Sequence, residues 1–171
     1  IGDAGMTALM GAIASGALAL LRTLVLSSNR IGDAGMTAFA GAIGTSGALP
    51  NLTYLSLVRN QISDMGMASF SDAVSRGALE NLVDLNLTGN AITDVGMTAF
   101  ANAIRSGALR NLKTLALRRN AISDAGMQAL ATAVRSGALP NLVRLFVGGN
   151  PGNTDGVKQA CMQRGIKTPF I

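Results

Sequence analysis

Residues 82–97 read LVDLNLTGNAITDVGM, and they contain the pattern from which the fold of the chain can be predicted. Its leucines are spaced as Leu-x-x-Leu-x-Leu up to Asn90, which indicates a short strand with one buried face. The next residues, 92–97, place Asp94 at the start of a helix, where a carboxylate favours the positive end of the helix dipole. The stretch therefore predicts a strand, a turn and a helix start, in that order.

The same pattern recurs along the chain. Blocks that open on Ile-x-Asp-x-Gly-Met follow one another every 30 residues, with one block of 31 whose extra residue falls within 44–46. A fixed period of this size indicates a solenoid, in which each unit buries its apolar faces against its neighbours. The five blocks begin at Ile1, Ile31, Ile62, Ile92 and Ile122.

Each block continues as an amphipathic helix. In the second block Met36, Phe39, Ala40 and Ile43 follow the spacing of one apolar stripe. The motif methionines are therefore interpreted as core residues: Met6, Met36, Met67, Met97 and Met127. The motif glycines are expected to allow close packing of helix and strand: Gly35, Gly66, Gly96 and Gly126. The glycine of a later Gly-Ala-Leu is expected to end each helix: Gly16, Gly47, Gly77, Gly107 and Gly137.

An asparagine follows each predicted strand. A buried side-chain amide at this point can bond backbone groups of its own turn and of the next unit. Stacking of the units then predicts a hydrogen-bonded structural ladder formed by Asn29, Asn60, Asn90, Asn120 and Asn150.

The full pattern, Leu-x-x-Leu-x-Leu-x-x-Asn-x-Ile-x-Asp-x-Gly-Met, resembles the leucine-rich repeats of the ribonuclease-inhibitor-like subfamily. That subfamily includes ribonuclease inhibitor, Ran GTPase-activating protein and NLR-type receptors. The resemblance implies an α/β solenoid, a horseshoe with a parallel β-sheet on its concave face and α-helices on its convex face. It also implies protein recognition as the default function, although a fold alone does not establish a function.

The domain organisation follows from the repeats. Residues 1–151 form five tandem repeats, and residues 152–171 are expected to form a C-terminal cap made of a helix and a short final strand. The chain begins in the middle of a unit, without an N-terminal cap, so we expect it to be a fragment of a longer protein.

Composition argues against catalysis and metal binding. The chain has no histidine and one cysteine, Cys161, which we interpret as a buried cap residue. The helix-start acids are not clustered in one loop as a calcium site requires. We therefore expect no enzyme activity, no metal and no cofactor. The single cysteine and the absence of a signal peptide favour a cytoplasmic or nuclear protein, and glycine-rich turns within the uncharged runs argue against membrane insertion.

The residues that the repeat does not dictate are candidates for binding. Strand positions between the buried leucines alternate to the concave face and should form two columns down the stack: Thr23, Tyr54, Asp84, Thr114 and Arg144, then Val25, Ser56, Asn86, Ala116 and Phe146. There and on the rim, six basic residues oppose one acid, and two aromatics add the residue types that anchor interfaces. The basic residues include Arg22. The candidate partner-binding residues are Tyr54, Arg59, Asp84, Lys113, Arg118, Arg119, Arg144 and Phe146.

We therefore interpret the chain as a non-catalytic scaffold whose concave face binds an acidic protein surface, consistent with its net charge of +5. Two alternatives remain open. One is a GTPase-activating regulator of the Ran type, although no functional residue of that class can be assigned here. The other is a nucleic-acid-binding module, which the shortage of stacking aromatics and of dense basic runs disfavours.

Overall fold

The computed structural model describes residues 1–44 and 48–169, in which helices and parallel strands alternate. The expected extra residue of the second block, at 44–46, and the helix-ending Gly47 fall largely or wholly outside the described residues, as do Phe170 and Ile171. The elements are α1 (Asp3–Ala14), β1 (Thr23–Val25), α2 (Asp33–Ile43), β2 (Tyr54–Ser56), α3 (Asp64–Ser75), β3 (Asp84–Asn86), α4 (Asp94–Arg105), β4 (Thr114–Ala116), α5 (Asp124–Arg135), β5 (Arg144–Phe146) and α6 (Asp155–Gln163).

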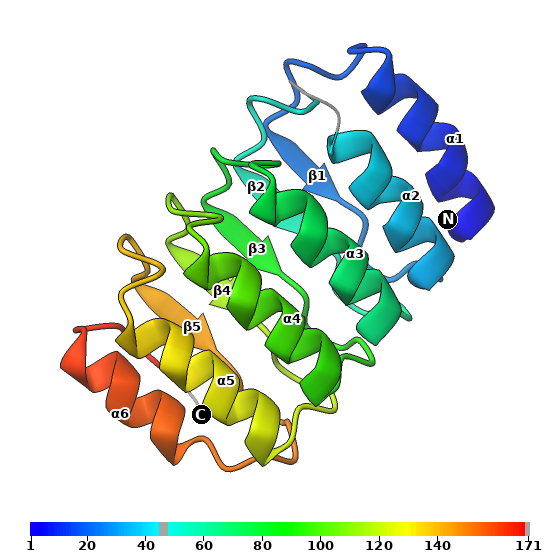
Figure 1. Ribbon diagram of the computed structural model, residues 1–171. Coiled ribbons are helices and arrows are strands. Elements are labelled where there is room, and N and C mark those ends of the chain that lie inside the picture. The colour runs from blue at the N-terminus through cyan, green and yellow to red at the C-terminus, as the bar shows by residue number, and fades with distance from the viewer. Residues whose placement is uncertain (45–47, 170–171) are drawn as a thin grey trace.

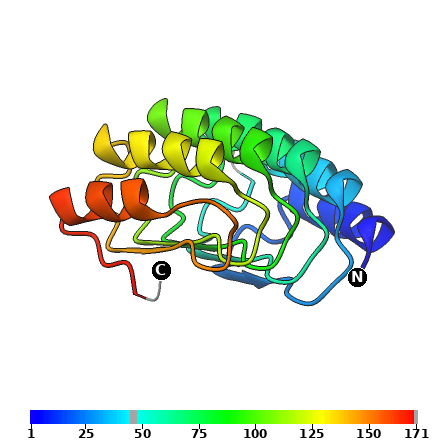
Figure 2. The same ribbon diagram turned by 90° about the horizontal axis from the view of Figure 1, so that it is seen from below.

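The strands form one parallel sheet in the order β1-β2-β3-β4-β5, so each coil pairs with the next one along the chain. Figure 1 shows the helices stacked side by side in front of this sheet. Figure 2 shows them as the outer layer of a shallow arc, with the strands beneath. The predicted α/β solenoid is confirmed.

The register aligns equivalent residues of successive repeats. Leu55 pairs with Leu85, and Leu85 with Leu115, and all three side chains are fully buried under the helices. The two flanking columns lie on the opposite face of the sheet because strand side chains alternate. They are the predicted columns: Thr23, Tyr54, Asp84, Thr114 and Arg144, then Val25, Ser56, Asn86, Ala116 and Phe146.

The core lies between the sheet and the helices. All five motif methionines are buried, as predicted. The rings of Phe39, Phe70 and Phe100 stack along the solenoid with centroids 6.5 and 6.3 Å apart. Glycines follow five of the helices in the left-handed conformation (Gly16, Gly77, Gly107, Gly137 and Gly165), where a side chain would be strained.

The strand-ending asparagines connect neighbouring coils through backbone groups. The Asn60 amide nitrogen donates to the carbonyl of Leu57 in its own coil and to that of Leu26 in the preceding coil, at 3.1 and 2.9 Å. The Asn60 oxygen accepts from the backbone N–H of Ile31 at 3.1 Å. The asparagine was expected to bond backbone groups of the next unit. Its partners outside its own turn lie instead in the preceding coil, because the Asn60 side chain points toward the coil that contains β1.

The motif aspartates bond the next helix along the chain. Oδ1 of Asp64 accepts from the backbone N–H groups of Thr93 and Gly96, at 2.8 and 2.9 Å, and the Thr93 hydroxyl donates to Oδ2. These N–H groups open α4, where they have no partner within the helix. Asp33 and Asp94 repeat the arrangement with Ser63 and Ser123. Each aspartate thus lies in the first turn of its own helix, as expected, and caps the following one.

The motif glycines make this contact possible. A Cβ at Gly96 would lie 2.6 Å from Oδ1 of Asp64 and 3.1 Å from its Cα. The expectation that these glycines allow packing of helix on strand is wrong. Their close neighbour is the first turn of the preceding helix, because the carboxylate must reach the N–H of the glycine itself.

Replacing a motif glycine by alanine tests whether this position must lack a side chain. Gly96→Ala should lower the free energy of unfolding by about 1–3 kcal/mol, because the new methyl displaces the Asp64 carboxylate. Gly41→Ala is the matched control, since a Cβ there meets nothing within 4 Å. In that helix interior alanine should raise stability by about 0.5–1 kcal/mol. Urea unfolding of both variants gives the comparison, and equal stabilisation by both would contradict the proposed contact.

The aspartate contact also predicts a pH dependence. The hydrogen bond from the Ser123 hydroxyl, helped by backbone N–H groups, lowers the pKa of Asp94 against the opposing effect of burial. A lowered folded-state pKa contributes stability that is present above the unfolded pKa, about 3.9, and is lost as pH falls through the folded value. Asp94→Asn should therefore be less stable than wild type at pH 6, and the gap should shrink below pH ~4. A constant gap across an acid titration of urea midpoints would refute this.

Candidate functional site

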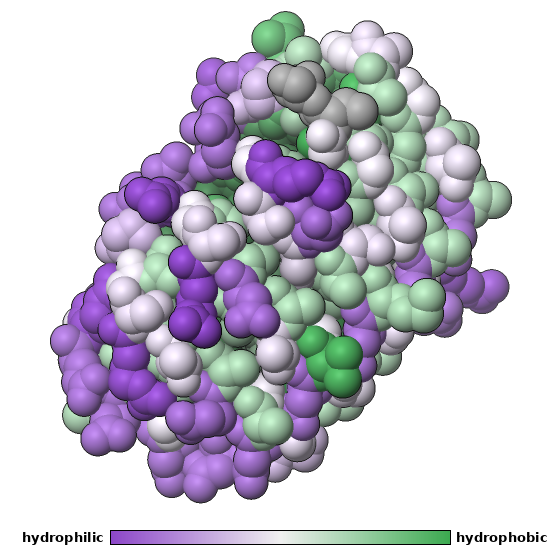
Figure 3. Space-filling model, in the orientation of Figure 1, coloured by the Kyte–Doolittle hydropathy of each residue, from purple (hydrophilic) through white to green (hydrophobic). Residues whose placement is uncertain are grey.

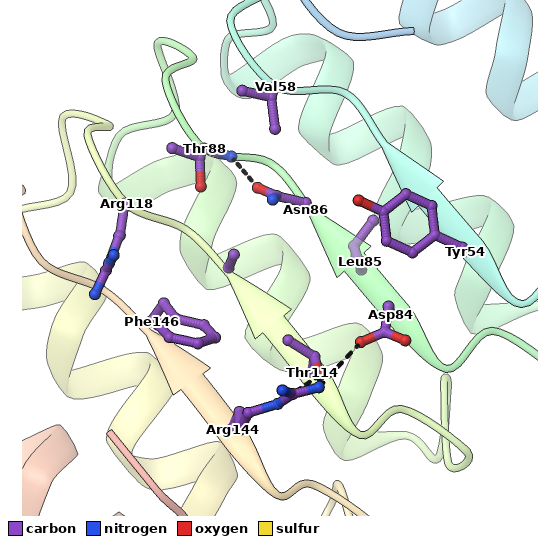
Figure 4. Close-up of a pocket in the computed structure, with 11 residues that line it drawn as sticks. Tyr54, Val58, Asp84, Leu85, Asn86, Thr88, Thr114, Arg118, Arg144 and Phe146 are labelled. Carbon is purple, nitrogen blue, oxygen red and sulfur yellow. Dashed lines mark hydrogen bonds and ion pairs between the residues drawn. The ribbon is translucent and has the colours of Figure 1, made fainter. Parts of the chain in front are cut away.

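A hollow of about 370 Å³ lies on the face of the sheet that the helices leave uncovered. Side chains from successive coils line it, and Figure 4 shows them projecting from β2 to β5 and the turns after them. Five of the predicted binding residues meet here: Tyr54, Asp84, Arg118, Arg144 and Phe146.

Arg144 crosses the sheet inside this hollow. Its guanidinium donates to the hydroxyl of Thr114 on β4, from Nε at 3.2 Å and Nη2 at 3.0 Å. Nη2 also lies 3.9 Å from a carboxylate oxygen of Asp84 on β3 (Figure 4). Both charged side chains are partly exposed, so this ion pair is weak and a partner can exchange for either group.

Arg118 is held more firmly than the sequence suggests. Its guanidinium carbon lies 4.9 Å from the ring centroid of Phe146, and Nη2 donates to the carbonyl of Pro169 at 2.7 Å. The segment before Pro169 is itself anchored, because Lys167 pairs with β5 by accepting from Leu145 at 3.0 Å and donating to Val143 at 2.8 Å. Arg118 is therefore not a freely solvated rim charge. It is half-buried between an aromatic ring and the C-terminal segment.

The remaining predicted residues are not gathered in this hollow. Arg59 and Arg119 are exposed and line an adjoining hollow of about 570 Å³, beyond the carboxyl ends of the strands, which also includes Arg118. Lys113 lies at the opposite edge of the sheet, in a shallow depression shared with Arg22. The basic residues thus occupy three separate places along the open face and its two edges.

The helix side of the molecule lacks such a combination. Among the described aromatic residues, Phe39, Phe70 and Phe100 are buried, whereas Tyr54 and Phe146 line the open sheet face. Figure 3 shows the helix side with neutral and apolar side chains over the N-terminal helices and hydrophilic ones gathered toward α6. Aromatic and guanidinium groups that can anchor a partner therefore coincide only on the sheet face of the described chain.

The family is evident from comparison with known proteins. A family model described as "Leucine Rich repeat" matches residues 17–40, 43–71, 78–101 and 108–131. The chain belongs to the leucine-rich repeat family. No curated protein matches it.

Two solved structures show the same fold as this leucine-rich repeat protein. An internalin from Listeria monocytogenes superimposes with a TM-score of 0.59 and 22% identity, over 92% of this chain and 37% of the internalin chain. The leiomodin-1 actin-binding site 2 superimposes with a TM-score of 0.64 and 15% identity, over 91% of this chain and 84% of that one. At these identities the likeness shows the fold alone.

A second row of asparagines was not foreseen from the sequence. Exposed asparagine side chains before β2, β3, β4 and β5 donate to a carbonyl of the preceding coil, as Asn81 does to Pro50 and Asn111 to Glu80, at 2.9 and 3.0 Å. Asn51 and Asn141 make the same bond to Ala19 and Arg110. The signal was present as the Asn-Leu pair that opens the leucine pattern. These residues pin the edge of the sheet beside Lys113.

Other groups that could perform chemistry are absent or engaged within residues 1–44 and 48–169. No three histidine, cysteine or acidic side chains come together there as metal ligands would. Cys161 is fully buried, and burial raises the pKa of its thiol to about 11, which keeps it protonated. In the same ranges, no helix has the length and apolar character needed to cross a bilayer.

The unequal environments of the two neighbouring arginines can be tested directly. Arg118→Ala removes the ring contact and the bond to Pro169, so it should lower the free energy of unfolding by about 1–2 kcal/mol. The N–H of Lys167 should then exchange faster with deuterium. Arg119→Ala is the control and should stay within about 0.5 kcal/mol of wild type. Equal effects of the two substitutions would show that the C-terminal segment does not depend on Arg118.

Proposed function

We propose that this leucine-rich repeat protein is a non-catalytic interaction scaffold that binds an acidic protein surface through its concave sheet face. One observation carries the proposal: Tyr54, Phe146, Arg118 and Arg144 line a single hollow on that face. Tyrosine and arginine are enriched among the residues that dominate binding energy in protein interfaces. Leucine-rich repeats commonly mediate interactions between proteins, which supports the same reading.

The size and charge of the face agree with a protein partner. Five strands at about 4.8 Å spacing give a sheet about 20 Å across, which suits a standard interface of about 800 Å² per partner. The three hollows on the open face and at its edges are lined by six basic side chains and one acid, and that acid, Asp84, is already paired with Arg144. The uncompensated charge is therefore positive and complements an acidic surface.

The absence of catalysis is supported by the state of the reactive groups. The chain has no histidine to act as a base. The Cys161 thiol is buried with a raised pKa, and the motif carboxylates of Asp33, Asp64 and Asp94 accept hydrogen bonds from the next helix. These groups serve the fold, so none of them is poised to act on a substrate.

Two finer assignments belong to the same proposal. We place the repeats in the ribonuclease-inhibitor-like subfamily, supported by a full α-helix of 11 or 12 residues in each repeat, although the period of 30–31 residues is slightly longer than that of the subfamily. We also place the protein in the cytoplasm or nucleus, supported by its single, reduced and buried cysteine.

Paired surface variants test the proposal. Tyr54→Ala with Arg144→Glu alters the concave hollow, whereas Met65→Ala with Arg105→Glu makes the same kind of change on exposed helix residues. Tagged wild type and both variants are used for affinity capture from native lysate, with quantitative mass spectrometry. We expect a set of acidic proteins that the helix variant retains and the concave variant loses. Retention of the same proteins by both variants would exclude the concave face as the binding site.

A further inference from the structure

The third residue after each strand has the left-handed backbone conformation. The φ values are 56° at Ser28, 52° at Arg59, 73° at Gly89, 51° at Arg119 and 77° at Gly149. Glycine adopts this conformation freely, whereas a side chain strains it. Two of the five positions nevertheless carry an arginine.

Burial of the side chain does not offset that strain at the two arginines. The leucines with positive φ, Leu49, Leu79 and Leu109, are 2–4% exposed, so the burial of their side chains stabilises the turn. Arg59 and Arg119 are exposed. Strained exposed residues of this kind are characteristic of functional positions, where the side chain serves a contact outside the fold.

At the same position of the next coil, each arginine has a glycine that leaves room for its side-chain stem. A Cβ at Gly89 would lie 3.3 Å from Cγ of Arg59, and one at Gly149 would lie 3.1 Å from Cγ of Arg119. Each arginine stem therefore lies against the glycine of the next coil. The alternation places the backbones of the two arginines two coils apart, about 10 Å by the spacing of parallel strands.

The hollow that these side chains line has only positive charge. Among its described lining residues are Arg59, Arg118 and Arg119 and no carboxylate. Within the described chain, the ion pairs join other residues, so neither Arg59 nor Arg119 is neutralised internally. The hollow on the sheet face that contains Tyr54 and Phe146 is called the aromatic hollow. It shares Arg118, Val58 and Thr88 with this hollow, so the two are continuous.

We propose that this three-arginine hollow binds the side-chain carboxylates of an acidic segment of the protein partner. The inference rests on the proposed function and adds the chemistry of one subsite to it. Guanidinium groups pair with carboxylates in bidentate geometry. The described lining of the hollow has three guanidinium groups and no aromatic ring, so it suits two or three carboxylates rather than a stacked nucleic-acid strand.

The test replaces both strained arginines by the residue that neighbouring repeats use. Arg59→Gly with Arg119→Gly should leave the thermal midpoint at or above that of wild type, because glycine relieves the backbone strain. Binding of a fluorescein-labelled oligoglutamate peptide, followed by anisotropy at low salt, should weaken by about tenfold. Arg59→Asn with Arg119→Asn gives a second variant that also tolerates positive φ and should weaken binding equally.

A charge-matched control separates a site from net charge. Arg105→Gln with Arg135→Gln removes the same charge from exposed ends of α4 and α5 and should leave peptide affinity within about twofold of wild type. Equal weakening by this control, or unchanged binding in the glycine variant, would overturn the inference. Tighter binding of an oligothymidylate of equal charge through the same arginines would also overturn it.

The same variants separate this inference from the proposed function. If captured lysate proteins are lost with Tyr54→Ala and Arg144→Glu but kept, at unchanged affinity, by Arg59→Gly with Arg119→Gly, the concave face binds its partner without the arginine hollow. In that case the proposed function survives and the present inference fails. Loss of the same proteins with both pairs of substitutions supports both.

Discussion

One carboxylate oxygen, repeated from coil to coil, joins each repeat of this solenoid to the next. Oδ1 of Asp33, Asp64 and Asp94 accepts two backbone N–H groups at the start of the following helix. Those N–H groups have no partner inside their own helix, and leaving them unpaired near the core would cost free energy. Because the acceptor comes from the neighbouring coil, a helix start is complete only when the previous repeat is in place.

This contact dictates the other residues of the motif. The third helical residue is glycine because the carboxylate occupies the space of a side chain, 2.6 Å from where a Cβ would lie at Gly66. The residue before the next aspartate is Ser63, Thr93 or Ser123 in three repeats, and its hydroxyl donates to the second carboxylate oxygen. On the strand side the asparagines make the equivalent connection through leucine carbonyls. Stability is therefore shared between neighbours, as expected for a quasi-one-dimensional fold.

The same architecture leaves one surface free to vary. Leucine, methionine and phenylalanine side chains fill the layer between sheet and helices, and the residues that alternate to the open face lie outside this layer. That face holds the aromatic hollow with Arg144 and Arg118, and the arginine hollow adjoins it. The C-terminal segment reaches the boundary of the two hollows through the bond from Arg118 to Pro169. The end of the chain thereby orients a side chain of the proposed binding face.

The period, the parallel solenoid, the buried columns and the residues that alternate to the open face could be predicted from the sequence, because they depend on local spacing that recurs in every repeat. The same spacing placed Tyr54, Asp84 and Arg144 in one column, which the register of β2, β3 and β5 through β4 confirms. Three features could not be predicted in this way: Asp64 caps the helix after its own, Arg118 donates to Pro169, and Lys113 lies apart from Arg59 and Arg119. Each of these features depends on where a side chain from one coil meets the backbone of another coil. The repeat pattern specifies which residues lie on a face of the solenoid, but it does not specify how far, or in which direction, their side chains extend across that face.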